Sequence, residues 1–536
     1  MSIKDYYKDC LGDKAKLRKF FAEMPKGADL HNHLTGAAYA ETLFAIAYRE
    51  HLFVNMETGK LVKKIDPYDP DAEKYIQLTD ETFAPDEHGY KKHDFHFTRT
   101  ALLDLWSVRD FQPYKYPLGA DEYFFSLFGN FIAAAGKDYL PEIVHNLKVR
   151  AKEENLQYIE TMGMNPTVPP NAFLDSLDPQ KYEEYSSAFK MSCQEYHMEP
   201  GVEINDDINK ILAAITGIII FYEDSYNKSS DLYNAVTKYI EDCVSILAQN
   251  KDKVFVTRKF DTVQVSDSDV LMKLLGYASR NKDPFDVLCQ LYIVHKAMQV
   301  RPDVIIGCNI VAAENSENSM QYYKLHMLMF YVLKNWFIGI TGNEPNTSLH
   351  AGELTMGLIP PEHLTYHVND ALFIAGAKRI GHGVDIAFEH NSEEALCYMA
   401  TNKIPIEINL TSNEFILGVK DDIHPFNIYK KYNVPIIIST DDPGILRTSI
   451  TEEYALAAYR YNLTYDEVKD IVSNSIEYSF LSKDDKDSIR GKYTKALEAF
   501  EDKYRDYPFK KTKKTPKKNF SSVKERRTGK PTRLLS

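Results

Sequence analysis

Short β-branched, apolar runs alternate with longer segments of helical periodicity along most of this chain of 536 residues. Eight runs have the composition of strands, and most are followed by a helical segment: residues 28–33, 157–161, 304–311, 337–341, 348–350, 379–382, 405–409 and 435–439. Helical periodicity is clearest over 316–334 and 392–401. Strands that alternate with helices pair in parallel, so the pattern predicts an α/β fold. Eight such units predict a (β/α)8 TIM-type barrel.

Two stretches exceed a minimal barrel. Residues 52–118 are rich in Lys, Asp, Tyr and Pro and have few sustained apolar faces. Residues 165–300 predict a helical insertion between the second and third strands, with helical runs at 208–222, 230–248, 268–277 and 284–300. A rival assignment makes 254–257 a strand in place of 304–311.

Charge separates the chain into an acidic body and a basic end. Residues 510–536 hold 11 of the 64 Lys and Arg and one of the 77 Asp and Glu, so residues 1–509 hold 53 against 76 and carry about −23. We expect 1–509 to form one barrel with insertions, and 510–536 to be a disordered tail suited to anionic partners. An acidic body argues against nucleic-acid binding on the folded part.

Cysteine usage and hydropathy favour a cytoplasmic location. The six cysteines form no CxxC pair, which is typical of reduced thiols: Cys10, Cys193, Cys243, Cys289, Cys308 and Cys397. The first 21 residues lack the apolar core of a signal peptide. The longest strongly apolar run, about twelve residues at 211–222, is too short to cross a bilayer.

The candidate chemistry lies in four short segments, each just after an expected strand. In the first, His31 and His33 alternate along a strand and therefore point the same way, so both can reach one metal. Two unrelated loop histidines are the alternative reading. Further along, His350 ends a strand, and Gly352 allows a sharp turn that folds Glu353 back over the same site. A dipole-stabilising Glu at a helix N-terminus would explain Glu353 but not His350.

The remaining two segments carry His382 and a pair of carboxylates. His382 lies between two glycines, which suit close approach of a ligand or a simple turn. Asp441 and Asp442 follow an apolar strand, where adjacent carboxylates are costly unless they serve a metal, a ligand or a cap. Because Pro443 follows, Asp442 as a helix N-cap stays an alternative. Together the four segments predict a zinc-dependent hydrolase with its site at one rim of the barrel.

A second group of histidines competes for the metal. His88, His93 and His96 have spacings that can bind zinc, but they lie among lysines and acids in the first insertion. No strand or helix is predicted to hold them, so solvated surface histidines are the better interpretation.

The four segments resemble those of the adenosine deaminase family of metal-dependent amidohydrolases: residues 24–36 (MPKGADLHNHLTG), 350–353 (HAGE), 379–383 (RIGHG) and 439–443 (STDDP). The length and insertions are more similar to the growth-factor-type branch than to compact members. The resemblance covers roughly 20–50, 100–165 and 303–505.

This resemblance implies deamination of adenosine to inosine and ammonia with one zinc ion per chain, held by His31, His33, His350 and Asp441. It further implies that Glu353 protonates purine N1, that His382 orients and helps deprotonate the attacking water, and that Asp441 belongs to the catalytic set. His33, Thr35, Gly342 and Asp442 would contact substrate, with the Gly342 amide at N3 and Asp442 at N7. Compact members carry Asp where Thr35 stands, and the usual Cys-Pro pair is missing at 407–413.

Other functions stay open at this point. Adenine, AMP or a 5′-modified adenosine could replace adenosine as substrate, and an inactive barrel could act as a binding protein. The oligomeric state also stays open, with a homodimer as one possibility. Ring opening of a cyclic amide fits less well, because those sites commonly use a Lys after the fourth strand, where we expect Thr341–Glu344. Cytidine-type zinc deaminases are excluded, because their Pro-Cys-x-x-Cys ligand pair is absent.

Overall fold

Eight parallel strands form a closed barrel at the centre of the structure. A computed structural model describes residues 3–169, 178–191, 205–228, 230–248, 255–258, 261–264 and 270–505. Four strands pair in the order β1-β5-β8-β9: Ala28–Asp29, Tyr158–Met162, Leu271–Ser279 and Ile305–Val311. The other four pair in the order β10-β11-β12-β13: Ser348–Ala351, Arg379–His382, Ile406–Ile408 and Ile436–Ile438.

Single parallel bridges join these two sheets into one barrel. Cys308 of β9 pairs with Thr347, next to β10, and Asn32, just after β1, pairs with Asp441, just after β13. Nearly every strand residue is buried. Parallel strands covered on both faces need such continuous apolar runs, which is why the strands were recognisable in the sequence. The predicted (β/α)8 fold is confirmed.

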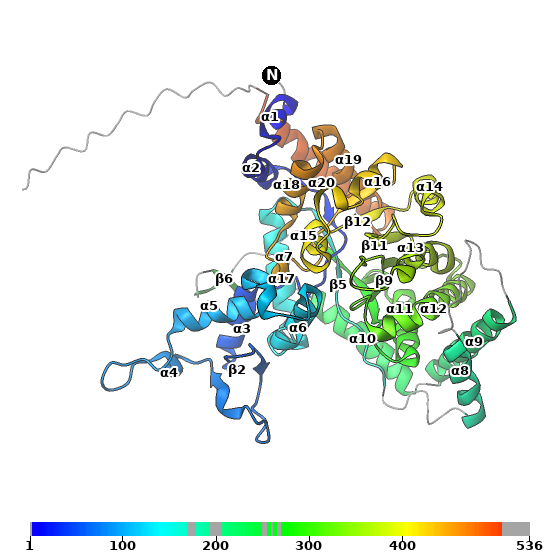
Figure 1. The fold of residues 1–536 in the computed structure, drawn as a ribbon, viewed down its shortest axis with the longest axis horizontal. Helices are drawn as coiled ribbons and strands as arrows, with labels where there is room; N and C mark the ends of the chain where they lie inside the picture. Colours follow the sequence, from blue (N-terminus) through cyan, green and yellow to red (C-terminus); the bar gives the residue numbers. More distant parts are fainter. Residues whose placement is uncertain are drawn as a thin grey trace, which may run out of the picture.

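Helices cover the outside of the barrel (Figure 1). Those that follow the strands from β8 onward are α11 (Pro284–Val300), α12 (Glu317–Thr341), α13 (His367–Asp370), α14 (Ser392–Asn402), α15 (Leu410–Leu417), α16 (Phe426–Lys431), α17 (Pro443–Leu446), α18 (Ile450–Tyr461), α19 (Tyr465–Glu477) and α20 (Lys483–Asp502). The N-terminal helices α1 (Ile3–Cys10) and α2 (Lys14–Glu23) pack on this C-terminal group, where Phe20 contacts the rings of Tyr465 and Phe500.

The two insertions extend to different sides of the barrel (Figure 1). The first lies between β1 and β5, after α3 (Ala40–Arg49), and holds strands β2 (Phe53–Asn55), β3 (Leu61–Val62) and β4 (Tyr75–Gln77) and helices α4 (Asp80–Phe83) and α5 (Phe95–Leu105). Helices α6 (Ala120–Phe131) and α7 (Leu140–Glu153) follow it before β5. The second, between β5 and β8, comprises α8 (Pro179–Met191), α9 (Asp206–Asn227), α10 (Asp231–Leu247) and the hairpin of β6 (Phe255–Arg258) and β7 (Asp261–Gln264).

Two strand assignments from the sequence are wrong. The third barrel strand is β8, where residues 268–277 predicted a helix, and the run at 304–311 is the fourth strand. Leu271, Leu274 and Leu275 have helical spacing, but parallel pairing with β5 and β9 overrides this local preference. The second insertion therefore ends before β8, and the helix expected at 284–300 is the barrel helix α11.

Residues 337–341 are also not a strand. They are the end of α12, which continues from the predicted helix at 316–334 until Gly342 adopts a left-handed φ of 72° and ends it. The rival segment at 254–257 is a strand from Phe255, but it pairs only with β7 in a hairpin outside the barrel.

Three further predictions concern the cysteines, the basic segment and membrane-spanning helices. Five cysteines lie in the described residues and none forms a disulfide, whereas Cys193 and the basic segment 510–536 lie outside those residues. Within the same ranges no helix combines the length and the apolar character that crossing a membrane requires.

Candidate active site

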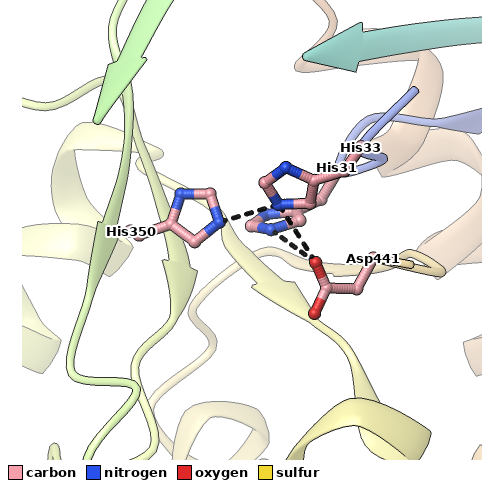
Figure 2. Close-up of side chains that lie close together, drawn as sticks. All are labelled: His31, His33, His350 and Asp441. Atoms are coloured by element: carbon pink, nitrogen blue, oxygen red, sulfur yellow. Dashed lines mark hydrogen bonds and ion pairs between the residues drawn. The ribbon is translucent and has the colours of Figure 1, made fainter. Parts of the chain in front are cut away.

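Three histidines and one aspartate converge where the strands end, on the C-terminal side of the barrel. His31 and His33 follow β1, His350 lies in β10, and Asp441 follows β13 (Figure 2). Each offers one ligand atom, an imidazole nitrogen or a carboxylate oxygen, and these four atoms all lie within 4.8 Å of one another. His33 Nε2 is 3.2 Å from both Asp441 Oδ1 and His350 Nε2, and His31 Nε2 is 3.5 Å from Asp441 Oδ1.

Hydrogen bonds fix the tautomers of two of these histidines. His31 Nδ1 donates to Glu407 Oε2 at 2.7 Å, and His350 Nδ1 donates to Asn309 Oδ1 at 3.0 Å. Each Nε2 is thereby left with its lone pair directed into the cluster. An outer carboxylate or amide that accepts from the far ring nitrogen is the usual support of a metal-bound histidine.

The residues present fit a divalent metal. His31 Nε2 is buried and has no hydrogen-bond partner among the described residues. Although burial opposes it, interactions with the carboxylates of Asp441 and Glu407 raise the pKa of His31 to about 10. Burial also opposes the shift of Asp441, whose pKa is held well below its ordinary value by interactions with the imidazoles of His31 and His33. The cluster offers three imidazole nitrogens and one carboxylate, and the negative charge of Asp441 and Glu407 favours a bound cation. This set of ligands matches the ligand chemistry of zinc.

The backbone is strained where it turns into the site. His382 has φ 67° and Asp441 has φ 62°, left-handed values that non-glycine residues rarely adopt. Such strain costs about 1–3 kcal/mol per residue and concentrates at functional sites. Glycines create the space around these turns, since a Cβ on Gly381 would lie 2.7 Å from His31 and one on Gly36 would lie 1.5 Å from Asp442.

Glu353 lies beside the cluster without joining it. The backbone turns at Gly352, with φ 75°, and the amides of Gly352 and Glu353 donate to the two carboxylate oxygens of Glu314 at 3.1 and 3.0 Å. Burial, and then the charge of Asp441, raise the pKa of Glu353 well above its ordinary value. Its carboxyl is 3.5 Å from His382 Nδ1, and burial lowers the pKa of His382 to about 3. The surroundings of Glu353 therefore favour its neutral, protonated form, next to the metal ligands.

A cavity of about 320 Å³ opens onto these groups. Its polar lining includes Glu353, Asp441, Asp442 and Thr35, and its apolar wall includes Phe124, Phe125, Phe128 and Tyr277. Asp442 occupies the N-cap position of α17 but makes no capping hydrogen bond, and burial raises its pKa to about 8. No Lys or Arg lies among the lining residues that the structure describes.

The structure does not place Gly342 in the site. Gly342 ends α12 at the exposed start of the loop before β10, whereas the cavity lies beyond the opposite ends of the strands. The error follows from the misassigned fourth strand. The loop after the true fourth strand, β9, begins with Ala312 at φ 83°, and both Ala312 and Ala313 line the cavity. This loop also carries no Lys, so a carboxylated lysine is absent after the correct strand as well.

Sequence reasoning missed the residues that support the ligands. Glu407 is buried between His31 and Arg379, and Arg379 also pairs with Glu160 at 2.7 Å. The signal was present, because a charged residue inside an apolar strand must be paired. The aromatic wall from α6 gave no such signal, because its phenylalanines read as ordinary core. His88, His93 and His96 belong to none of the metal-ligand groups found in the described ranges, and His88 and His96 are exposed.

Known proteins give matches that agree with this site. A sequence profile of the family described as adenosine deaminase matches residues 238–496. The adenosine deaminase of Clostridium kluyveri is 26% identical over 198 residues, 37% of this chain and 52% of that protein. That of Clostridium perfringens is 33% identical over 144 residues, 27% of this chain and 40% of that protein. The matches thus span about half, or less, of the length of these relatives.

One solved structure supports the fold. Arabidopsis ADAL, crystallised with GMP, superimposes with a TM-score of 0.50 at 17% identity, covering 89% of this chain and 98% of that one. The barrel and its histidine–aspartate cluster define a metal-dependent barrel of the amidohydrolase superfamily. Within that superfamily, residues 238–496 match the adenosine deaminase family.

Proposed function

We propose that this chain is a zinc-dependent adenosine deaminase, which converts adenosine and water to inosine and ammonia. The observation that carries the proposal is one cavity lined by His33, His350, Asp441, Glu353 and Asp442 together. It combines a metal-ligand cluster with a buried neutral acid and a purine-sized apolar wall. Cavities of about 300–1,000 Å³ are typical of small-molecule sites.

His31, His33, His350 and Asp441 would hold the zinc. Once bound, the ion supplies Lewis acidity, which makes water a competent nucleophile near neutral pH. The chain's own outer contacts, from Glu407 and Asn309, keep the two histidine rings in the tautomer that this role needs.

Glu353 is suited to deliver the proton that deamination requires. Addition of water at C6 breaks the aromaticity of the ring, so N1 must gain a proton at the same time. A carboxylic acid can donate this proton only while it is neutral, and burial favours the neutral form of Glu353 by raising its pKa. The exocyclic amino group then leaves as ammonia, and the 6-oxo purine remains.

The walls of the cavity favour a nucleoside over a nucleotide. Phe124, Phe128 and Tyr277 supply aromatic surface for a base, and the lining residue Asp442 has a buried Oδ1 without a hydrogen-bond partner among the described residues. A 5′-phosphate would meet carboxylates and, among the described lining residues, no cation.

A panel of 6-aminopurines tests the proposal on the zinc-loaded chain. We expect inosine and ammonia from adenosine at a higher kcat/KM than from adenine, AMP or 5′-modified adenosine, with about one zinc per chain. A higher kcat/KM for another member of the panel would identify that purine, in place of adenosine, as the substrate. A zinc-loaded chain that deaminates none of them would refute the proposal and leave the barrel a binding protein.

A further inference from the structure

A chain of buried hydrogen bonds reaches His382 from behind, away from the cavity. The backbone N–H of Phe426 lies 3.1 Å from His424 Nδ1, and His424 Nε2 lies 3.1 Å from Asn413 Oδ1. Asn413 Nδ2 then lies 3.0 Å from His382 Nδ1. The three side chains are buried, and they come from α15, the loop before α16, and β11.

The backbone amide at the start of this chain sets its direction. An N–H can only donate, so His424 Nδ1 is an acceptor, and the neutral ring carries its hydrogen on Nε2. Burial, with a smaller effect of Arg460, lowers the pKa of His424 to about 3, so the ring stays neutral. His424 Nε2 therefore donates to the amide oxygen of Asn413, which leaves the amide nitrogen to donate to His382 Nδ1.

The hydrogen of His382 is consequently on Nε2, the nitrogen that faces the cluster. This atom is buried, has no hydrogen-bond partner among the described residues, and lies 4.0 Å from Asp441 Oδ2. The second neighbour of Nδ1 is the Glu353 carboxyl at 3.5 Å, which as a neutral acid can donate to Nδ1 but does not require a hydrogen there. His31 and His350 have the opposite arrangement, since each donates from Nδ1 and directs a bare Nε2 inward.

We propose that Asn413 and His424 are positioning residues that hold His382 as the Nε2–H tautomer. His382 then gives a hydrogen bond to the reacting oxygen and does not accept a proton at Nε2. This role for the reaction rests on the proposed function, whereas the tautomer itself does not. It changes the sequence-based expectation that His382 helps to deprotonate water.

Nitrogen-15 NMR of histidine-labelled, zinc-loaded chain tests the tautomer directly. We expect the ring nitrogens of His382, assigned by their loss in His382→Gln, to show a protonated Nε2 and an unprotonated Nδ1. His424 should show the same pattern. A wild-type His382 protonated on Nδ1 would overturn the proposal whatever the enzyme does with purines, so this result is distinct from a failure of the deaminase assignment.

Variants extend the test to catalysis. Asn413→Asp removes the only donor of the side chain while keeping its shape, so it should move the His382 hydrogen to Nδ1 and lower kcat by about 10–100-fold, with zinc content and KM little changed. The exposed Asn402→Asp is the matched control. His424→Phe should lower kcat similarly, and His424→Gln, which keeps an N–H donor, should recover part of it. An unchanged His382 spectrum in Asn413→Asp would refute the positioning role.

Discussion

The two halves of the barrel contribute to the site in different ways. In the half from β10 to β13, strands of three or four residues carry His350 and His382, and tight turns directly after the strands carry Glu353 and Asp441. In the half from β1 to β9, the turn after β1 brings the metal ligands found among the described residues. The rest of that half provides the wall of the cavity, much of it from α6, which lies between β1 and β5.

This difference indicates that one half of the barrel determines the chemistry and the other determines which substrate binds. Short strand-to-turn junctions hold a side chain rigidly, as proton transfer and metal binding require. A cavity wall built from a helix that is not part of those junctions can change without disturbing them. Substitutions in the cavity wall of the first half should therefore affect KM, and those at the strand-end residues of the second half should affect kcat or metal content.

The largest effect is expected from His350→Ala. Loss of a ligand leaves an incomplete site, so most zinc should be lost and activity should fall by well over the ~10–100-fold that loss of an outer hydrogen-bond partner costs. Metal analysis and kcat on the same sample measure both. Full zinc occupancy with near-normal turnover would show that His350 is not a ligand.

Glu353→Gln should separate chemistry from binding. The amide cannot donate a carboxylic proton, so kcat should fall by about 10²–10⁴-fold while zinc and substrate binding persist. Equilibrium binding of a purine inhibitor and metal content serve as controls. A loss smaller than about tenfold would mean that Glu353 is not the acid.

Phe128→Ala tests the opposite half. Removing one aromatic face should weaken purine binding by roughly 1–2 kcal/mol, which is about a 5–30-fold rise in KM, with little change in kcat. Phe97→Ala, on the exposed face of α5 where Phe97 is 73% exposed, should leave both parameters unchanged. Equal effects of the two variants would remove α6 from the substrate site.

The smallest effect is expected from Thr35→Asp. A carboxylate at this position of the cavity should repel a 5′-phosphate and accept a hydrogen bond from a free 5′-hydroxyl. The ratio of kcat/KM for adenosine to that for AMP should rise, whichever of the two the wild type prefers, while zinc content stays the same. Unchanged ratios across adenosine, adenine and AMP would place the sugar elsewhere.

The sequence predicted the strand-end chemistry better than the strands themselves. His31, His33, His350 and Asp441 were recognisable because ligand residues directly follow apolar runs, and the structure brings all four together. The fold class followed from the same alternation of runs and helices. The sequence did not predict strand β8 because its leucines have helical spacing. Its strand conformation results from pairing with β5 and β9.

Residues that act through distant contacts could not be predicted. Gly342 was predicted in the site because residues 337–341 were predicted to be the fourth strand. The true fourth strand is β9, and the loop after it brings Ala312 to the cavity instead. Asn413 and His424 have no spacing that announces a link to His382, because their contact exists only after α15 folds against β11. The phenylalanines of α6 likewise gained a role only from the position of their helix.

The bridge between Asn32 and Asp441 joins residues from opposite ends of the chain, so it can form only late in folding. Beside it, the hydroxyl of Thr440 donates to Asp29 Oδ2 at 2.6 Å, across 411 residues of sequence. Contacts this distant form late, because the entropy of closing a long loop must be met before they contribute. On a ribosome, neither end of the chain can complete the ligand cluster until almost the whole barrel has been made. Metal binding by this cluster would thus mark finished folding, and we expect a stalled or truncated chain that ends before residue 441 to bind no metal there.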